Sequence, residues 1–201
     1  MALFRAGCTR MVELARSEFL LGGQRSGKSR RAESLASQWL QAAPHRRAVM
    51  VATAQAWDDE MRERIARHRA DRRDRVPGML TVEEPVAVAD ALQRHSAPDT
   101  LVVVDCLTLW LSNLMMPMHA ADALDEGSVV DAGQRLCRSV AAAPGPVVLV
   151  GNEIGLGVIP MGREVRAFVD ALGRLNQQVA AACERVTLMA AGLPMVLKGV
   201  V

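Results

Sequence analysis

One short segment near the N-terminus constrains the fold of this chain more than any other feature. An apolar run that predicts a strand over Glu18–Leu21 precedes it, and amphipathic sequence that predicts a helix over Lys28–Ala42 follows it. The segment matches the pattern G-x-x-x-x-G-K-S/T in full and consists of Gly22, Gly23, Gln24, Arg25, Ser26, Gly27, Lys28 and Ser29. Strand, glycine-rich turn and helix in this order predict a P-loop, and an ordinary strand-to-helix turn is the less favoured alternative.

The P-loop sequence indicates phosphate chemistry. Its glycines allow backbone N–H groups to line a concavity of the size of an anion, and the helix N-terminus adds partial positive charge. We expect Lys28 to reach the β- and γ-phosphates of a nucleotide and the Ser29 hydroxyl to bind Mg²⁺. Asp105 follows the apolar run Leu101–Val104. We predict that it holds the same Mg²⁺, directly or through water, with a helix cap as the alternative.

Strands and helices alternate along the rest of the chain. Short apolar runs predict strands over residues 48–53, 80–82, 101–105, 147–150, 186–189 and 195–197, whereas the charged stretch 69–78 predicts an exposed loop. This order predicts an α/β fold of the three-layer P-loop NTPase type, with a mostly parallel central sheet and helices on both faces. Ligands of such sheets bind beyond the carboxyl ends of the strands. The polar stretches that follow strands should therefore gather at one edge.

Length and composition bound the domain organisation and the partners. The 201 residues suit one domain over residues 18–201. We interpret residues 1–17 as an N-terminal extension, frayed or arising from an early start codon, with a short transit peptide as the alternative. A net charge of +2, with three Trp, three Phe and no Tyr, argues against nucleic acid as a partner, and no apolar stretch is as long as a membrane span. The four cysteines lack metal-ligand spacing and are interpreted as reduced thiols in the cytoplasm.

His68 differs from the other three histidines in its surroundings. Arg64 lies one helical turn before it and Arg72 one turn after it, on the same side of a charged helix that Asp58 and Asp59 open. A cationic surround favours neutral imidazole and attracts phosphate, and neutral imidazole can attack an α-phosphorus. Taken alone, these residues still favour a solvated or packed helix histidine over a catalytic one.

Several blocks of sequence together resemble one enzyme family. Besides the P-loop they are Asp-Asp-Glu-Met at 58–61, Arg-Ile-Ala-Arg-His-Arg at 64–69, Val-Asp-Cys-Leu-Thr-Leu-Trp-Leu-Ser-Asn-Leu at 104–114 and Asn-Glu-Ile-Gly-Leu-Gly-Val-Ile-Pro at 152–160. They resemble the bifunctional adenosylcobinamide kinase / adenosylcobinamide-phosphate guanylyltransferase family of cobalamin biosynthesis. The resemblance extends, in order, over residues 19–198. The blocks around His68 and after Asn152 are far more specific to this family than the P-loop.

The resemblance implies a two-step transferase that uses GTP, ATP and Mg²⁺. An NTP would phosphorylate the aminopropanol hydroxyl of adenosylcobinamide. GTP would then guanylylate an enzyme histidine, and GMP would pass to adenosylcobinamide phosphate, giving adenosylcobinamide-GDP and pyrophosphate. The resemblance places the guanylylated histidine at His68, with Lys28 as the second catalytic residue, and suggests a homo-oligomer, a trimer. Nucleotide contacts would come from the P-loop and from Val51, Ala52, Thr53, Arg69, Ala70, Asp71, Arg72, Glu83 and Asp105.

Several features of the sequence leave more than one interpretation. The sequence after His68 carries extra residues and lacks a Trp of the family pattern, and Val169 stands where the family often has Arg. Asn152 and Glu153 are expected either to bind substrate or Mg²⁺ or to cap a turn. The exposed, Met-rich stretch Leu107–Met118 is a candidate interface. A simple small-molecule kinase and a nucleotide-dependent switch are the competing functions.

Overall fold

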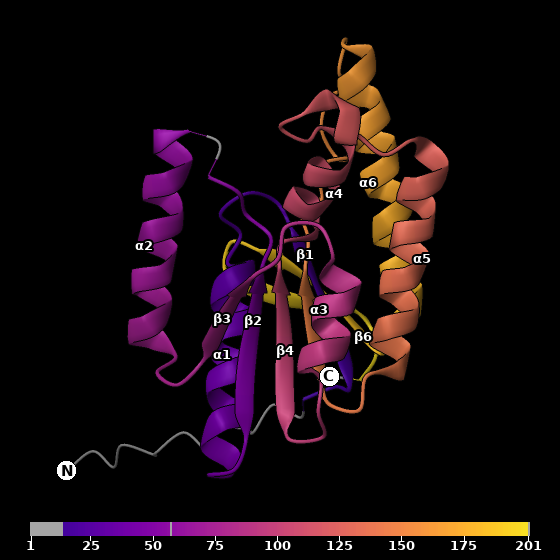
Figure 1. Cartoon of the computed structure of the whole chain (residues 1–201). Coiled ribbons are helices and arrows are strands. Elements are labelled where there is room, and N and C mark those ends of the chain that lie inside the picture. Colours follow the sequence, from indigo (N-terminus) through magenta and orange to yellow (C-terminus); the bar gives the residue numbers. More distant parts are fainter. Residues whose placement is uncertain (1–13, 57, 201) are drawn as a thin grey trace, which may run out of the picture.

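The structure is a computed structural model of the chain and describes residues 14–56 and 58–200. Strands and helices alternate in the order that the sequence predicts (Figure 1). The strands are β1 (Ser17–Gly22), β2 (Arg47–Ala52), β3 (Leu80–Glu83), β4 (Thr100–Asp105), β5 (Val147–Val150), β6 (Arg185–Ala190) and β7 (Leu193–Lys198). The helices are α1 (Lys28–Ala42), α2 (Asp59–Arg75), α3 (Val88–His95), α4 (Leu107–Met115), α5 (Glu126–Ala142) and α6 (Arg163–Ala182), with a short 3-10 turn at Ala120–Asp122.

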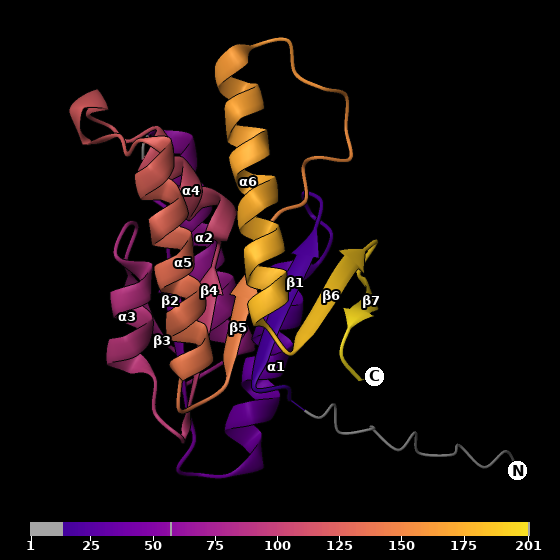
Figure 2. The ribbon, with the colours of Figure 1, turned by 90° about the vertical axis from the view of Figure 1, so that its right-hand side faces the viewer.

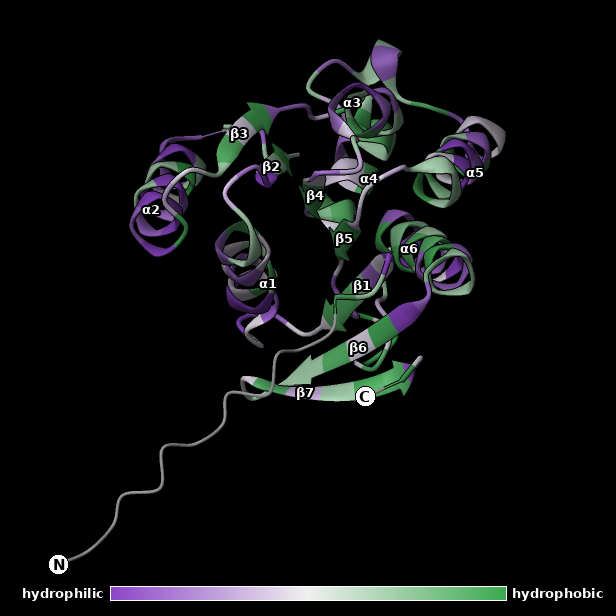
Figure 3. Ribbon diagram, turned by 90° about the horizontal axis from the view of Figure 1, so that it is seen from below, coloured by the Kyte–Doolittle hydropathy of each residue, from purple (hydrophilic) through white to green (hydrophobic). Residues whose placement is uncertain are grey.

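One sheet joins all the described strands in the order β3-β2-β4-β5-β1-β6-β7. Every neighbouring pair is parallel except β6 and β7, which form the closing antiparallel pair. Seen from below, α1 and α2 lie on one side of the sheet and α3 to α6 on the other (Figure 3). The α/β prediction with helices on both faces of a mostly parallel sheet is therefore confirmed.

The two faces of the sheet bury separate apolar clusters, because alternate residues of a strand point to opposite faces. On the α1 side, Leu20, Met50 and Val103 pack with Leu35 of α1. On the other side, a larger cluster forms around Phe19, with further residues from β2, β4, β5 and helices α3 to α6. Strands with both faces covered read as continuous apolar runs, which explains their clear signal in the sequence.

The charged stretch after His68 departs from prediction. We expected a loop over residues 69–78, but α2 continues to Arg75. Asp58 caps its N-terminus by accepting a hydrogen bond from the Met61 amide (2.7 Å), and three arginines in the last turn suit the negative end of the helix dipole. Such a run of charge is stable as a helix with a solvated surface when ion pairs support it.

Most of the predicted N-terminal extension lies outside the described residues. Its last residues are attached to the domain, because Ser17 belongs to β1 and the Arg16 amide donates to Glu184 Oε2 (2.9 Å). Among the described residues, no helix combines the length and apolarity needed to cross a membrane.

Candidate active site

The P-loop segment connects β1 to α1 at the carboxyl edge of the sheet. Gly22 and Gly27 adopt φ values of +150° and +101°, and a Cβ at Gly22 would lie 2.4 Å from the Met189 carbonyl oxygen, so the segment requires glycine there. Lys28 Nζ folds back over the loop and donates to the Gly22 and Gly23 carbonyls (2.9 and 2.7 Å). Burial lowers the pKa of this ammonium group, and the Cys106 and Asp105 side chains oppose that shift.

Asp105 is the point at which the predicted site residues converge. Its carboxyl is buried, which raises its pKa, while the positive charge of Arg72, a hydrogen bond from Ser29 and the charges of His68 and Lys28 oppose the rise. Ser29 and Lys28 belong to α1, whereas His68 and Arg72 belong to α2. Residues that lie far apart in the sequence therefore meet around one carboxyl group.

The C-terminal half of α2 and the end of β3 form a cationic wall beside this point. Arg69 pairs with Glu83, and Arg72 donates to Thr81 Oγ1 (3.2 Å), although its buried Nε lacks a hydrogen-bond partner among the described residues. A cavity of about 420 Å³ lies against this wall. Ala70 and His68 are exposed. Glu83 ends β3 at the same edge of the sheet as the P-loop, and Arg69 reaches it there, whereas Arg72 contacts β3 further back, at Thr81.

Comparison with known proteins identifies the same enzyme family that the sequence blocks resemble. A family model described as cobinamide kinase / cobinamide phosphate guanyltransferase matches residues 18–197. The chain belongs to this family. It is 45% identical over 184 residues to the bifunctional adenosylcobalamin biosynthesis protein CobP of Pseudomonas aeruginosa, covering 90% of this chain and 97% of that protein. It is 35% identical to the bifunctional adenosylcobalamin biosynthesis proteins CobU of Escherichia coli and of Salmonella typhimurium, covering 88% of this chain and 97% of each of those proteins.

A solved structure outside the cobinamide kinase family shares the fold. The flagellar accessory protein FlaH from Methanocaldococcus jannaschii superposes with a TM-score of 0.53 at 13% identity, covering 92% of this chain and 80% of that one. At this identity the likeness concerns the fold alone. For this chain, the cobinamide kinase family together with the P-loop-like fold implies nucleotide binding.

Val51, Ala52 and Thr53 are the remaining predicted nucleotide-contact residues, and they lie at the carboxyl end of β2. The Val51 side chain is fully buried in the core, and Ala52 pairs with Asp105 across the sheet. The Thr53 hydroxyl accepts from the Cys106 amide and donates to the Cys106 carbonyl, both at 2.8 Å, so it is occupied by the β4–α4 turn. A side-chain contact with ligand is thus not expected of Val51 or Thr53.

Sequence reasoning missed two α4 residues that brace the site. Asn113 Nδ2 donates to the carbonyls of Thr53 (2.8 Å) and Pro85 (3.0 Å), and Trp110 Nε1 donates to the Val86 carbonyl (2.7 Å). These bonds tie α4 to the turns that follow β2 and β3. The available signal in the sequence was one Asn side chain within the apolar helical segment Leu107–Met115. A buried Asn needs hydrogen-bond partners, so its presence there indicates a structural contact.

Proposed function

We propose that this protein phosphorylates adenosylcobinamide with ATP or GTP and then guanylylates the product. In the second reaction, His68 attacks the α-phosphorus of GTP, pyrophosphate leaves, and GMP passes from His68 to adenosylcobinamide phosphate. The observation that carries this proposal is the convergence of His68, Lys28 and Ser29 on Asp105. A phosphate cradle and a nucleophile that share one edge can act on the same triphosphate.

The phosphate half of the site is suited to both reactions. Lys28 and the backbone amides of the P-loop would stabilise the negative charge that develops on the leaving phosphate groups. The Ser29 hydroxyl and the Asp105 carboxyl supply the oxygen ligands that Mg²⁺ prefers, and their direct contact places both donors at one point. Among the described residues there is no cluster of three metal-ligating side chains. Mg²⁺ held by Ser29 and Asp105 together with the nucleotide phosphates would neutralise phosphate charge.

The guanylyl half depends on α2. His68 is exposed on that helix, and its charge is one of those that oppose the rise in the pKa of Asp105. The proposal places its imidazole within reach of a nucleotide that the P-loop holds. Arg69, Ala70, Asp71, Arg72 and Glu83 would border the bound nucleotide, with the arginines attracting its phosphates. The corrinoid would approach from the open side of the same edge.

A covalent label tests the proposal. Wild-type protein incubated with Mg²⁺ and α-³²P-GTP should retain acid-labile, base-stable label after denaturation. His68→Ala should lose the label and keep the kinase reaction, whereas Lys28→Ala should lose about 100-fold or more in both reactions. His45→Ala is the matched control, because His45 is exposed beyond the far end of α1 and should label normally. Absence of label on wild type that still binds GTP would leave a simple kinase or a switch.

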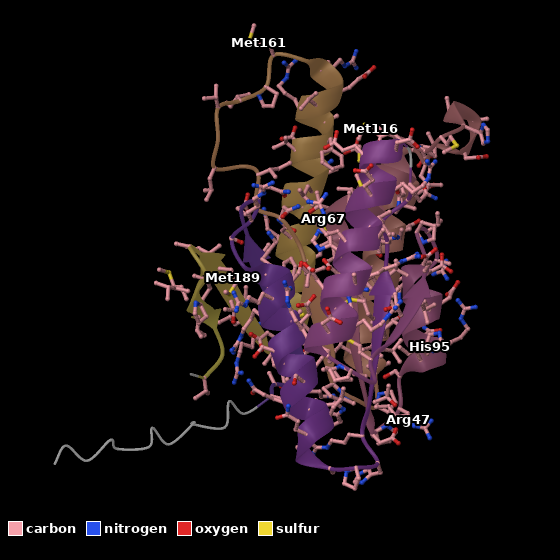
Figure 4. The ribbon with its side chains drawn as sticks, turned by 90° about the vertical axis from the view of Figure 1, so that its left-hand side faces the viewer. Arg47, Arg67, His95, Met116, Met161 and Met189 are labelled. Carbon is pink, nitrogen blue, oxygen red and sulfur yellow. The ribbon has the colours of Figure 1, made fainter. Side chains whose placement is uncertain are left out.

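We also propose a homo-oligomer, a trimer, acting in the cytoplasm. Most of α4 is buried, so the predicted interface at Leu107–Met118 is reduced to exposed side chains such as Met116 and Met118. A larger apolar surface lies in the loop before α6, where Leu156, Val158, Ile159 and Met161 are exposed; Figure 4 shows Met161 at the far end of the molecule. A cytoplasmic location is supported by the free thiols of Cys106, Cys137 and Cys183.

A further inference from the structure

The strand β5 delivers its last residues to the centre of the active site. It lies between β1 and β4, and its final residue, Val150, is level with Leu20 on one side and with Asp105 on the other. The chain that follows Val150 therefore leaves the sheet between the P-loop and Asp105. Figure 2 shows the long loop that leads from there to α6. Asn152 and Glu153, whose role the sequence leaves open, begin this loop.

Hydrogen bonds from three elements fix these two residues. The Glu153 amide donates to the Gly22 carbonyl (3.2 Å), the same oxygen that accepts from Lys28 Nζ at 2.9 Å. The Asn152 amide donates to Thr108 Oγ1 (2.9 Å), and its carbonyl accepts from Asn176 Nδ2 (3.1 Å). The backbone of Glu153 is thus anchored beside the lysine that is expected to bind the γ-phosphate.

Among Asp105, Glu83 and Glu153, the Glu153 carboxylate has the fewest interactions with other side chains. Asp105 is buried among Ser29 and positive charges, and Glu83 is paired with Arg69. Glu153 is partly exposed, and its carboxylate accepts one hydrogen bond, from the Gly155 amide at 2.7 Å, and makes no ion pair within the described part of the chain. Oε1 holds the turn, which leaves Oε2 without a hydrogen-bond partner among the described residues.

We propose that Glu153 is the general base of the kinase reaction. The proposal rests on the kinase half of the proposed function. The acceptor hydroxyl oxygen attacks the γ-phosphorus of the NTP, the bond from that phosphorus to the β–γ bridging oxygen breaks, and NDP leaves. The hydroxyl proton passes to the Glu153 carboxylate and then to water. A carboxylate performs this task in protein kinases, where it accepts the proton of the substrate hydroxyl.

This role separates the two reactions of the enzyme. Phosphorylation of a hydroxyl requires that a proton be removed, whereas the guanylyl acceptor is a phosphate that is already ionised at neutral pH. Glu153→Gln keeps an oxygen for the Gly155 amide and removes the base. We expect its kcat for phosphorylation of adenosylcobinamide to fall by about 10²–10⁴-fold. Its KM for NTP should not rise, because the lost negative charge lies near the phosphates.

The experiment measures both reactions on the same preparations. Glu153→Gln should still acquire label from α-³²P-GTP and transfer it to adenosylcobinamide phosphate at the wild-type rate, while its kinase reaction is lost. Glu164→Gln, an exposed acid at the start of α6, is the matched control and should match wild type in both reactions.

Two results would overturn the inference. Unchanged kinase activity in Glu153→Gln would remove the general-base role, and an equal loss of both reactions would assign Glu153 to loop or metal positioning. If wild type itself fails to phosphorylate the corrinoid while it still guanylylates His68, the proposed kinase function fails instead. Thermal melting of each variant distinguishes these outcomes from loss of the fold.

Discussion

Helices α1 and α2 lie side by side on one face of the sheet, yet they are attached to it by different forces (Figures 1 and 4). In α1, Ala32, Leu35 and Ala36 are fully buried against the strands. In α2 the apolar side chains Met61 and Ile65 are only partly buried, and the helix is mainly connected to its neighbours by arginines. One helix is held by apolar packing and the other by polar contacts.

This difference follows the division of chemistry in the site. The P-loop leads directly into α1, whose apolar side chains are buried against the sheet, so we expect the loop to be rigid before any ligand binds. His68 lies on α2, where screening by salt and competition with water weaken the contacts. The comparison suggests that the phosphate half is preformed and that the histidine half is easily displaced.

The largest effect on this comparison should come from truncating one apolar side chain in each helix. Leu35→Ala removes a fully buried side chain of α1 and should lower the free energy of unfolding by about 2–5 kcal/mol. Ile65→Ala removes a partly buried side chain of α2 and should cost about 1 kcal/mol or less. Urea denaturation followed by circular dichroism measures both values.

Ser34→Ala, on the exposed side of α1, serves as the control and should change stability little. Equal losses for Leu35→Ala and Ile65→Ala would mean that α2 is packed as firmly as α1, and the contrast between the two helices would disappear.

A second effect concerns the carboxyl group that both helices face. Burial raises the pKa of Asp105 above its ordinary value, so the folded state binds more protons than the unfolded state in the window between the two pKa values. Stability conferred by this group therefore is fully present below the unfolded pKa and falls as pH rises through that window. Without ligand, Asp105→Asn should have a higher Tm than wild type at pH 7, with the difference vanishing below about pH 4.

Scanning calorimetry across this pH range checks the expectation, with Asp122→Asn as the control because Asp122 is exposed. Mg²⁺ with GTP should raise the Tm of wild type more than that of Asp105→Asn, since the metal would favour the ionised carboxylate. A lower Tm for Asp105→Asn at pH 7 would show instead that the surrounding positive charges need this carboxylate for stability.

Much of the fold could be read from the sequence where one physical cause dominated. The buried strands are short apolar runs, and the helix that follows the P-loop was predicted with the bounds that the structure gives, Lys28–Ala42. The P-loop pattern and Asp105 could be singled out because phosphate and Mg²⁺ binding use fixed residue types at strand ends, and the structure places both at the ends of β1 and β4. The α2 extension over residues 69–75 was missed, because its support comes from partners distant in sequence, such as Glu33 and Glu83.

Residue roles in the candidate site could not be predicted from the sequence where they depend on contacts between residues that are distant in the chain. The Thr53 hydroxyl forms hydrogen bonds with the backbone of Cys106. The Asn113 side chain connects the turn at Thr53 with the turn at Pro85, 32 residues later in the sequence. Neither bond has a local sequence signature. The position of Glu153 beside the P-loop likewise depends on the strand order, which places β5 between β1 and β4.

The smallest effect should come from the polar link between the two helices. Arg75 of α2 contacts Glu33 of α1 (3.0 Å) and Asp71 one turn earlier (3.2 Å), and the hydrogen bond to Glu33 raises the pKa of the guanidinium group. Because Arg75 is about half exposed, the link should be weak and sensitive to salt. Arg75→Ala should therefore lower the Tm less than Leu35→Ala does, while amide hydrogen exchange in α2 becomes faster and exchange in the sheet stays unchanged.

Salt sharpens this last measurement. In about 1 M NaCl, where the Debye length is about 3 Å, α2 of wild type should exchange nearly as fast as α2 of Arg75→Ala. Arg73→Ala is the control, since Arg73 is exposed in the same turn and has no ion pair among the described residues. If exchange in α2 of wild type does not respond to salt, apolar contacts hold the helix and its displacement would have to involve the core. If it does respond, the polyanionic nucleotide of the proposed reaction could itself compete for the arginines that hold α2, so substrate binding and helix position would be coupled through charge alone.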